Sequence, residues 1–140
     1  MSHTELTKTI ENNLAVVERH FRLEATDVAR ALELYTDDIV WETSRGVTLS
    51  GKRAVGENYE KLFSSMRDVE LVPLDRFATE ERVVDDMLVR FTYAADGVPH
   101  APVRPGARVE MRLVHIFEMR GGKIAKEKVF ETWREVPSAG

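Results

Sequence analysis

The feature that most constrains the fold is a strict alternation of side chains in the segment "VEMRLVHIFEM", residues 109–119. Every second residue from Val109 onward is apolar except His115, and the positions between them include most of the charged residues of the segment. Because side chains of a β-strand point alternately to its two faces, this pattern predicts a strand with one buried face. The sequence "RGG" at 120–122 predicts a tight turn into a second strand, and hence a β-hairpin.

His115 lies on the predicted buried face of this strand. A polar ring in that position needs a hydrogen-bond partner, a ligand or a cavity, because burying it unpaired costs about 1–3 kcal/mol. Three interpretations stay open: a satisfied core histidine, a functional group that lines a pocket, or a different strand register, which would move every side chain to the other face.

Length and composition indicate one globular domain over residues 1–140. The hydrophobic share of 43% and the charged share of 31% are typical of a soluble protein and not of a disordered chain. No apolar run approaches the roughly 20 residues of a membrane span, and the first residues lack the apolar core of a signal peptide. We therefore expect no membrane partner and a cytoplasmic location.

Charge and ligand spacing argue against several classes of protein. The 20 basic and 24 acidic residues are interleaved and sum to a formal charge of -4, which disfavours a nucleic-acid partner. The chain has no cysteine, so thiolate nucleophiles and zinc–thiolate sites are excluded. The four histidines, which include His3 and His100, show no metal-ligand spacing, and no metal site is expected.

Three helices are predicted in the first half of the chain. Apolar residues at steps of three and four predict an amphipathic helix over 5–23, with His20 at the border of its apolar stripe. A second helix is predicted in "ATDVARALELYTDD", residues 25–38, with Thr26 as its cap and Tyr35 on its buried face. Helical spacing returns over 52–66.

Strands dominate the second half. A short strand, "IVWET", precedes the third helix, and four longer strands follow it, with Pro73 marking an edge or a bulge in the first of them. The loop 96–106, rich in proline and glycine, is predicted to be a mobile lip. Helices followed by antiparallel strands indicate an α+β fold, with the helices packed on one face of a curved sheet. The four long strands are expected at 69–78, 82–95, 108–120 and 123–135.

The neighbouring acids Asp85 and Asp86 look at first like a paired-carboxylate site. Adjacent strand residues point to opposite faces, so at most one of them can enter a pocket, and a solvated strand start is the favoured interpretation. Arg90, on the same predicted strand, is expected to pair with Glu110 across the sheet.

The predicted order α-α-β-α-β-β-β-β, together with "ALELYTDDIVWE" and "HIFEMRGGKIAKEKVF", resembles the nuclear transport factor two-like superfamily. Within it, the chain is most similar to the SnoaL-like polyketide cyclases and the ketosteroid-isomerase-like proteins. The resemblance implies a cone-shaped, curved antiparallel sheet with three helices on its concave face, around a deep apolar pocket. It also implies a homodimer and no cofactor.

The resemblance places three candidate catalytic residues. Aligned through "VWE", the proton-shuttling carboxylate of ketosteroid isomerases falls on Glu42, their protonated aspartate on His115, and their helical tyrosine near His20. Glu42 would be the base, His115 the acid or oxyanion donor, and His20 a supporting donor. Such a trio can move protons near neutral pH. The alternatives are a surface carboxylate for Glu42 and helix-border packing for His20.

The expected pocket walls are aromatic and apolar, and they serve two candidate functions. The first is a cofactor-independent proton-transfer enzyme, an isomerase, cyclase or dehydratase, acting on a small apolar carbonyl-bearing or polycyclic molecule. The second is a non-catalytic module of the same fold that binds a small ligand or dimerises. Aromatic residues at regular spacing are also common in ordinary cores. The predicted lining residues are Tyr35, Trp41, Tyr59, Leu113, Phe117, Phe130 and Trp133.

Overall fold

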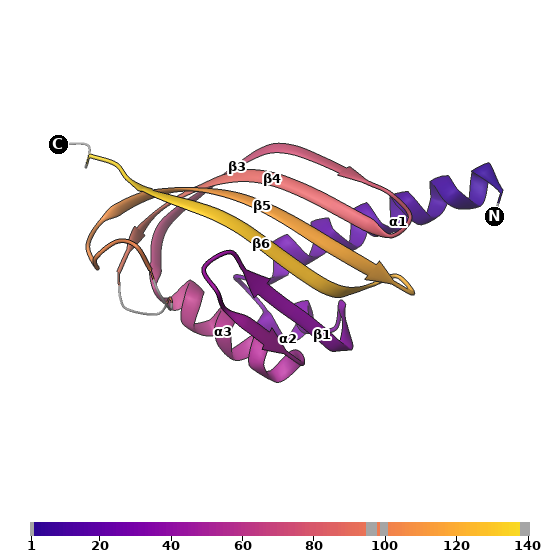
Figure 1. The fold of residues 1–140 in the computed structure, drawn as a ribbon, viewed down its shortest axis with the longest axis horizontal. Coiled ribbons are helices and arrows are strands. Elements are labelled where there is room, and N and C mark those ends of the chain that lie inside the picture. Colours follow the sequence, from indigo (N-terminus) through magenta and orange to yellow (C-terminus); the bar gives the residue numbers. More distant parts are fainter. Residues whose placement is uncertain (1, 95–97, 99–100, 138–140) are drawn as a thin grey trace.

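The computed structural model describes residues 2–94, 98 and 101–137, so part of the predicted mobile lip, His100 included, lies outside the described residues. Three helices and six strands form the fold (Figure 1). The helix 5–23 and the two strands of the hairpin were predicted to within a few residues. The elements are α1 (His3–Leu23), α2 (Val28–Leu32), β1 (Tyr35–Thr43), β2 (Thr48–Ser50), α3 (Lys52–Ser64), β3 (Met66–Ala78), β4 (Arg82–Tyr93), β5 (Arg108–Arg120) and β6 (Lys123–Glu135).

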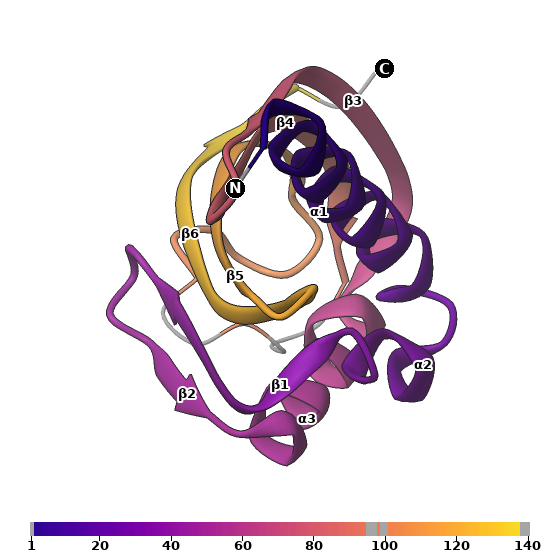
Figure 2. The same ribbon diagram turned by 90° about the vertical axis from the view of Figure 1, so that its right-hand side faces the viewer.

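The six strands form one curved sheet in the order β2-β1-β6-β5-β4-β3. The sheet curls so that α1 and α3 lie across its concave side (Figure 2). This arrangement confirms the predicted α+β cone. One pairing differs from the predicted antiparallel arrangement: β1 runs parallel to β6, while all other neighbouring strands are antiparallel. A parallel pair needs a long connection, and the chain from α3 to β5 supplies it.

The hairpin of β5 and β6 confirms the alternation seen in the sequence. Gly121 and Gly122 turn the chain with φ values of 59° and 77°, a conformation that favours glycine. On β5 the inner face is buried from Val109 to Phe117, and His115 lies on this face with 6% exposure. The predicted register is therefore correct, and the interpretation with a slipped strand is excluded.

The second helix is shorter than predicted. It ends at Leu32, and Tyr35 begins β1 instead of lying on a helix face. Tyr35, Ile39 and Trp41 are all buried at odd positions, so the period of the segment is two and not 3.6. The cap is also different, because the Asp27 side chain accepts the hydrogen bond from the Arg30 amide at 3.2 Å. Thr26 instead bonds back to a carbonyl of α1.

The segment 44–51 contains the short strand β2, which pairs with β1. The prediction for Pro73 is confirmed, since β3 is an edge strand with a register shift between Pro73 and Asp75. An edge tolerates proline because the missing N–H is not needed for a ladder. Among the described residues, no helix has both the length and the apolar character needed to cross a membrane.

The outer, convex face of the sheet carries large apolar side chains, and one of them corrects a prediction. Phe130 is 48% exposed on this face, so it does not line a pocket. The reason is its odd spacing from Trp133, which puts the two side chains on opposite faces of β6. Phe77 is 56% exposed on the same outer face. The homodimer stays a prediction, and these two rings are ones that a second copy could cover.

The burial of Phe117 and the exposure of Phe130 predict that removing the two rings lowers the free energy of unfolding by different amounts. We expect Phe117→Ala to lower the free energy of unfolding by about 3–5 kcal/mol, because Phe117 is fully buried. Phe130→Ala should cost less than about 1 kcal/mol. Urea unfolding at low micromolar protein measures both. Equal costs would contradict the register of β6, and a cost for Phe130→Ala that grows with protein concentration would indicate a covering second copy.

Candidate active site

A largely apolar cavity of about 80 Å³ lies between the inner face of the sheet and the helices α1 and α3. A single water needs roughly 10–15 Å³ by the same measure, so the space suits a small organic molecule. Most of its wall is aromatic, aliphatic or methionine. The polar side chains in the wall are Glu24, Arg45, Asn58, Tyr59, His115, Glu127 and Glu131.

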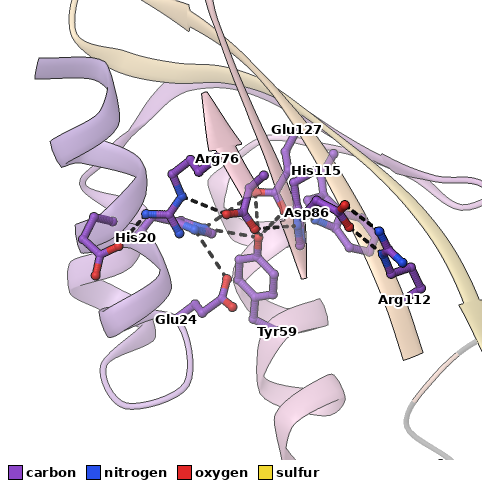
Figure 3. A network of polar contacts seen from close by, with 11 residues as sticks. His20, Glu24, Tyr59, Arg76, Asp86, Arg112, His115 and Glu127 are labelled. Atoms are coloured by element: carbon purple, nitrogen blue, oxygen red, sulfur yellow. Dashed lines mark hydrogen bonds and ion pairs between the residues drawn. The ribbon is translucent and has the colours of Figure 1, made fainter. Parts of the chain in front are cut away.

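Glu127, on β6, is the buried centre of a polar network (Figure 3). Its side chain is 2% exposed and faces the cavity. Trp41 donates its indole N–H to Oε2 at 2.9 Å, and the Tyr59 hydroxyl donates to the same oxygen at 3.0 Å. The Tyr35 hydroxyl lies 3.0 Å from Oε1. One carboxyl group is thus held by two residues of β1 and one of α3.

His20 extends this network from α1. Its side chain is fully buried, and Nε2 lies 2.7 Å from the Tyr35 hydroxyl, which in turn lies 2.6 Å from the Tyr59 hydroxyl. On the other side of the ring, Nδ1 lies 3.4 Å from a carboxylate oxygen of Glu24. The chain of contacts therefore runs from Glu24 through the imidazole and the tyrosines to Glu127.

The number of hydrogens in this network favours a protonated Glu127. Four short contacts link His20, Tyr35, Tyr59 and the Glu127 carboxyl, and each needs one hydrogen. Two hydroxyls and one imidazole N–H supply three of them. A proton on the carboxyl, donated to the Tyr35 hydroxyl, supplies the fourth and leaves the Tyr35 hydrogen for Tyr59, whereas an ionised carboxylate would leave two oxygen atoms in contact without a hydrogen.

The pKa values of the buried carboxyl groups agree with a protonated Glu127. Burial raises the pKa of Glu127 to about 7, against the opposing effect of the hydrogen bonds from Tyr59, Tyr35 and Trp41. Burial, followed by the charges of Glu127 and Asp85, raises the pKa of Glu24 well above its usual value. Glu127 is therefore populated in both its protonated and ionised forms near neutral pH, which suits a group that exchanges protons.

A second cluster of charged groups surrounds His115. Asp85, on β4, is the direct cross-strand neighbour of His115, and its Oδ2 lies 3.8 Å from Nδ1 of the ring. Arg76, on β3, donates to Asp85 Oδ1 at 2.8 Å and also pairs with Glu18 of α1. Burial, and next the charge of Arg76, lower the pKa of His115 to about 3. The ring is therefore neutral at pH 7.

The structure brings together two of the three predicted catalytic residues. His115 lines the cavity, and His20 lies behind it, with both rings packed against Phe21 and Phe117. Burial, and next the nearby His115, lower the pKa of His20 to about 3. His20 reaches the cavity through its contacts with the tyrosines, and the expected border position on the helix is in fact a fully buried one.

Glu42 does not join them. Its side chain is 35% exposed and lies 3.7 Å from the Lys126 ammonium group. The neighbouring Trp41 occupies the inner face of β1, so Glu42 points outward. The role expected for Glu42 therefore does not fit its position, whereas Glu127 lies in the cavity wall.

The predicted wall residues lie in different places relative to the cavity. Trp41, Tyr59 and Leu113 line the cavity. Tyr35 and Phe117 are buried next to it but are absent from its wall as far as the described residues define it. Trp133 packs edge-on against Phe91 and Tyr93 instead.

Two site residues, Glu127 and Asp85, were missed by the sequence reasoning, although a signal for each existed. On β6, Glu127 shares its face with Val129 and Trp133 at steps of two, so the alternation places it inside. On β4, Asp85 alternates with Val83 and Met87, both of which are buried. The solvated strand start therefore describes Asp86 alone. The predicted pair of Arg90 and Glu110 is confirmed at 2.9 Å.

Comparison with known proteins defines the family. The model of the SnoaL-like domain matches residues 17–127, and the chain belongs to this family. Among the described residues, no group of three or more histidine, aspartate or glutamate side chains is arranged to hold a metal ion.

Individual relatives are more distant. The chain is 26% identical over 132 residues to the phenazine biosynthesis protein PhzB of Pseudomonas fluorescens, with 91% of this chain and 79% of that protein covered. A SnoaL-like polyketide cyclase candidate from Jannaschia sp. CCS1 superposes with a TM-score of 0.75 at 20% identity, covering 87% and 86% of the two chains. The epoxide hydrolase/cyclase-like enzyme SalBIII, connected with pyran ring formation in salinomycin, gives a TM-score of 0.68 at 20% identity, covering 87% and 92%.

The raised pKa of Glu127 predicts a pH-dependent stability that Glu127→Gln removes. A pKa raised from 4.5 to about 7 means that the folded protein binds this proton more tightly. The contribution is complete below pH 4.5 and is lost as the pH rises to 7, by roughly 3 kcal/mol. We expect the difference in unfolding free energy, wild type minus variant, to fall by this amount and then to level off.

Urea unfolding of both proteins between pH 4.5 and 8 measures this difference. The lowered pKa values of His20 and His115 act in the opposite sense, since they remove stability as the pH falls below 6.5. They are present in both proteins and cancel in the difference to first order. A difference that does not change with pH would contradict the raised pKa.

Proposed function

We propose that this protein is a cofactor-independent enzyme that transfers protons to and from a small, largely apolar carbonyl compound bound in the cavity. The observation that carries the proposal is Glu127, a nearly inaccessible carboxyl group with a pKa of about 7 in the wall of an apolar cavity. Such a group holds and releases a proton near neutral pH, which is what general acid–base catalysis requires.

His115 is the second proton-transferring group of the proposal. In the hairpin, His115 is opposite Val129 and Phe117 is opposite Glu127, so His115 and Glu127 are diagonal neighbours on the same inner face. Diagonal neighbours have backbones about 7–8 Å apart, which leaves room for a substrate atom to reach both side chains. A carbonyl compound between them meets one group at its oxygen and the other at the neighbouring carbon.

Isomerases, cyclases and many dehydratases that act on carbonyl compounds share the formation of an enol. In each case a proton leaves the carbon next to the carbonyl group while the oxygen gains a proton or a hydrogen bond. The two groups in this cavity suit that common step. The family and the ring-forming relatives support this class of reaction, and the choice among isomerisation, cyclisation and dehydration depends on the substrate.

Exchange of α-protons for deuterium tests the common step without knowledge of the natural substrate. The probe is 2-tetralone, an apolar bicyclic ketone, whose proton NMR signals are to be followed in D₂O. The wild type is expected to accelerate the exchange above the protein-free rate, and Glu127→Gln should remove the acceleration. Glu42→Gln is the matched control, since it is the same substitution on the outer face, and it should stay within about twofold of wild type.

The competing function is a binding module without chemistry. It predicts that 2-tetralone binds, as seen by saturation-transfer NMR, while the exchange stays at the protein-free rate. A loss of exchange in Glu42→Gln together with full activity of Glu127→Gln would contradict the assignment of the carboxyl group.

A further inference from the structure

Three inner-face residues on adjacent strands form a continuous row beneath the cavity. Arg76 on β3 is opposite Asp85 on β4, and Asp85 is opposite His115 on β5. Asp85 and His115 are both buried, with exposures of 2% and 6%. Because directly opposed residues of a sheet have neighbouring side chains, the register of the sheet itself aligns the guanidinium, the carboxylate and the imidazole.

The two oxygen atoms of Asp85 have different partners. Oδ1 accepts the Nε–H of Arg76 at 2.8 Å. Oδ2 is buried, has no hydrogen-bond donor, and faces His115 Nδ1 at 3.8 Å, which is likewise buried and without a hydrogen-bond partner. The two unsatisfied atoms therefore face each other, and a small closing movement would join them.

The charges around the pair decide which nitrogen carries the ring hydrogen. Burial raises the pKa of Asp85, but the hydrogen bond and the charge of Arg76 oppose this effect and favour the carboxylate. Glu18 pairs with the other side of the guanidinium group. A carboxylate only accepts hydrogen bonds, and a neutral imidazole has a single N–H. The hydrogen is therefore favoured on Nδ1, where it faces Asp85, and Nε2 keeps a free lone pair for the cavity that His115 lines.

We infer that Asp85, oriented by Arg76, is a positioning residue that makes His115 the base of the proposed reaction and leaves Glu127 as the acid. The catalytic role given to His115 in this inference rests on the proposed function. The tautomer of His115 does not rest on it and can be measured independently. Before the reaction the substrate contacts no charged catalytic group, because the imidazole and the protonated carboxyl are both neutral.

The resulting step balances. Nε2 of His115 takes the proton from the carbon next to the carbonyl group, and the electron pair of that C–H bond forms the C=C bond of the enol. The carbonyl oxygen takes the proton of Glu127. The imidazolium, which burial and the charge of Arg76 disfavour in the resting site, then lies beside the Asp85 carboxylate, and closing of the 3.8 Å gap offsets this cost. The Glu127 carboxylate accepts hydrogen bonds from Tyr35, Tyr59 and Trp41. The cycle closes when both groups return a proton to the enol, and in D₂O the proton held by His115 is replaced by a deuteron before it returns to carbon.

Asp85→Asn tests the role of Asp85. Arg76 still needs an acceptor, so the amide oxygen of the new side chain is expected to face Arg76 and its NH₂ group to face His115. An NH₂ group donates to Nδ1 and moves the ring hydrogen to Nε2, which removes the lone pair from the cavity. Asp86→Asn is the matched control, because Asp86 is the adjacent residue on the outer face, where it pairs with Arg112.

Two readouts are measured on the full chain. Nitrogen-15 NMR of labelled histidine reports which nitrogen is protonated, with the His115 signals assigned by their loss in His115→Gln. Exchange of the α-protons of 2-tetralone reports the chemistry. The wild type and Asp86→Asn are expected to show Nδ1–H, and Asp85→Asn should show Nε2–H with the exchange slowed by roughly 10²-fold.

The outcomes separate this inference from the proposed function. Nε2–H in the wild type would overturn the inference even if Asp85→Asn failed to fold. A changed tautomer with an unchanged exchange rate would overturn the role of Asp85 in the reaction. The expected tautomers in a wild type that does not accelerate exchange would support the pairing of Asp85 with His115 and refute the proposed function.

Discussion

The rest of the structure depends on the burial of one carboxyl group, that of Glu127. A carboxyl group taken out of water is strongly destabilised unless hydrogen-bond donors surround it. Here the donors come from Tyr35 at the beginning of β1, from Trp41 near its end and from α3, and His20 adds a contact from α1. Four elements must therefore be docked together before the carboxyl group can be buried, and their docking encloses the cavity in which it functions.

Charged side chains form exposed ion pairs on the outer face of the curved sheet and buried contacts on its inner face. On the outer face, Asp86 forms a two-pronged pair with Arg112 in contact with water, and such pairs contribute little beyond solubility and register. One residue earlier, Asp85 lies on the inner face between Arg76 and His115. The same side chain thus has a surface role at one position and a place in the site at the next, because adjacent strand residues face opposite ways. The concave face gains its chemistry from a few polar residues in an otherwise apolar wall.

Much of the fold was predictable because local patterns specify it. The hairpin follows from alternation and a glycine pair, and α1 follows from helical spacing, although its capping box at Ser2 and Glu5 was not foreseen. The boundary between α2 and β1 could not be predicted, because Tyr35 fits both the helical and the strand period over a short window. Within the site, His115 was found because a polar ring interrupts an apolar face, whereas Glu127 was overlooked among the lysines of β6.

The sequence by itself determined the α+β class and the face of β5 that His115 shares with apolar residues, because these depend on periods of two and 3.6 that any short segment displays. Only the tertiary structure decided that Glu127 and not Glu42 lines the cavity. Glu42 and Glu127 are both glutamates on strands, and their difference arises from the parallel pairing of β1 with β6, which sets Trp41 beside Glu127 and turns Glu42 outward. That pairing joins segments more than 80 residues apart, and no local pattern encodes it.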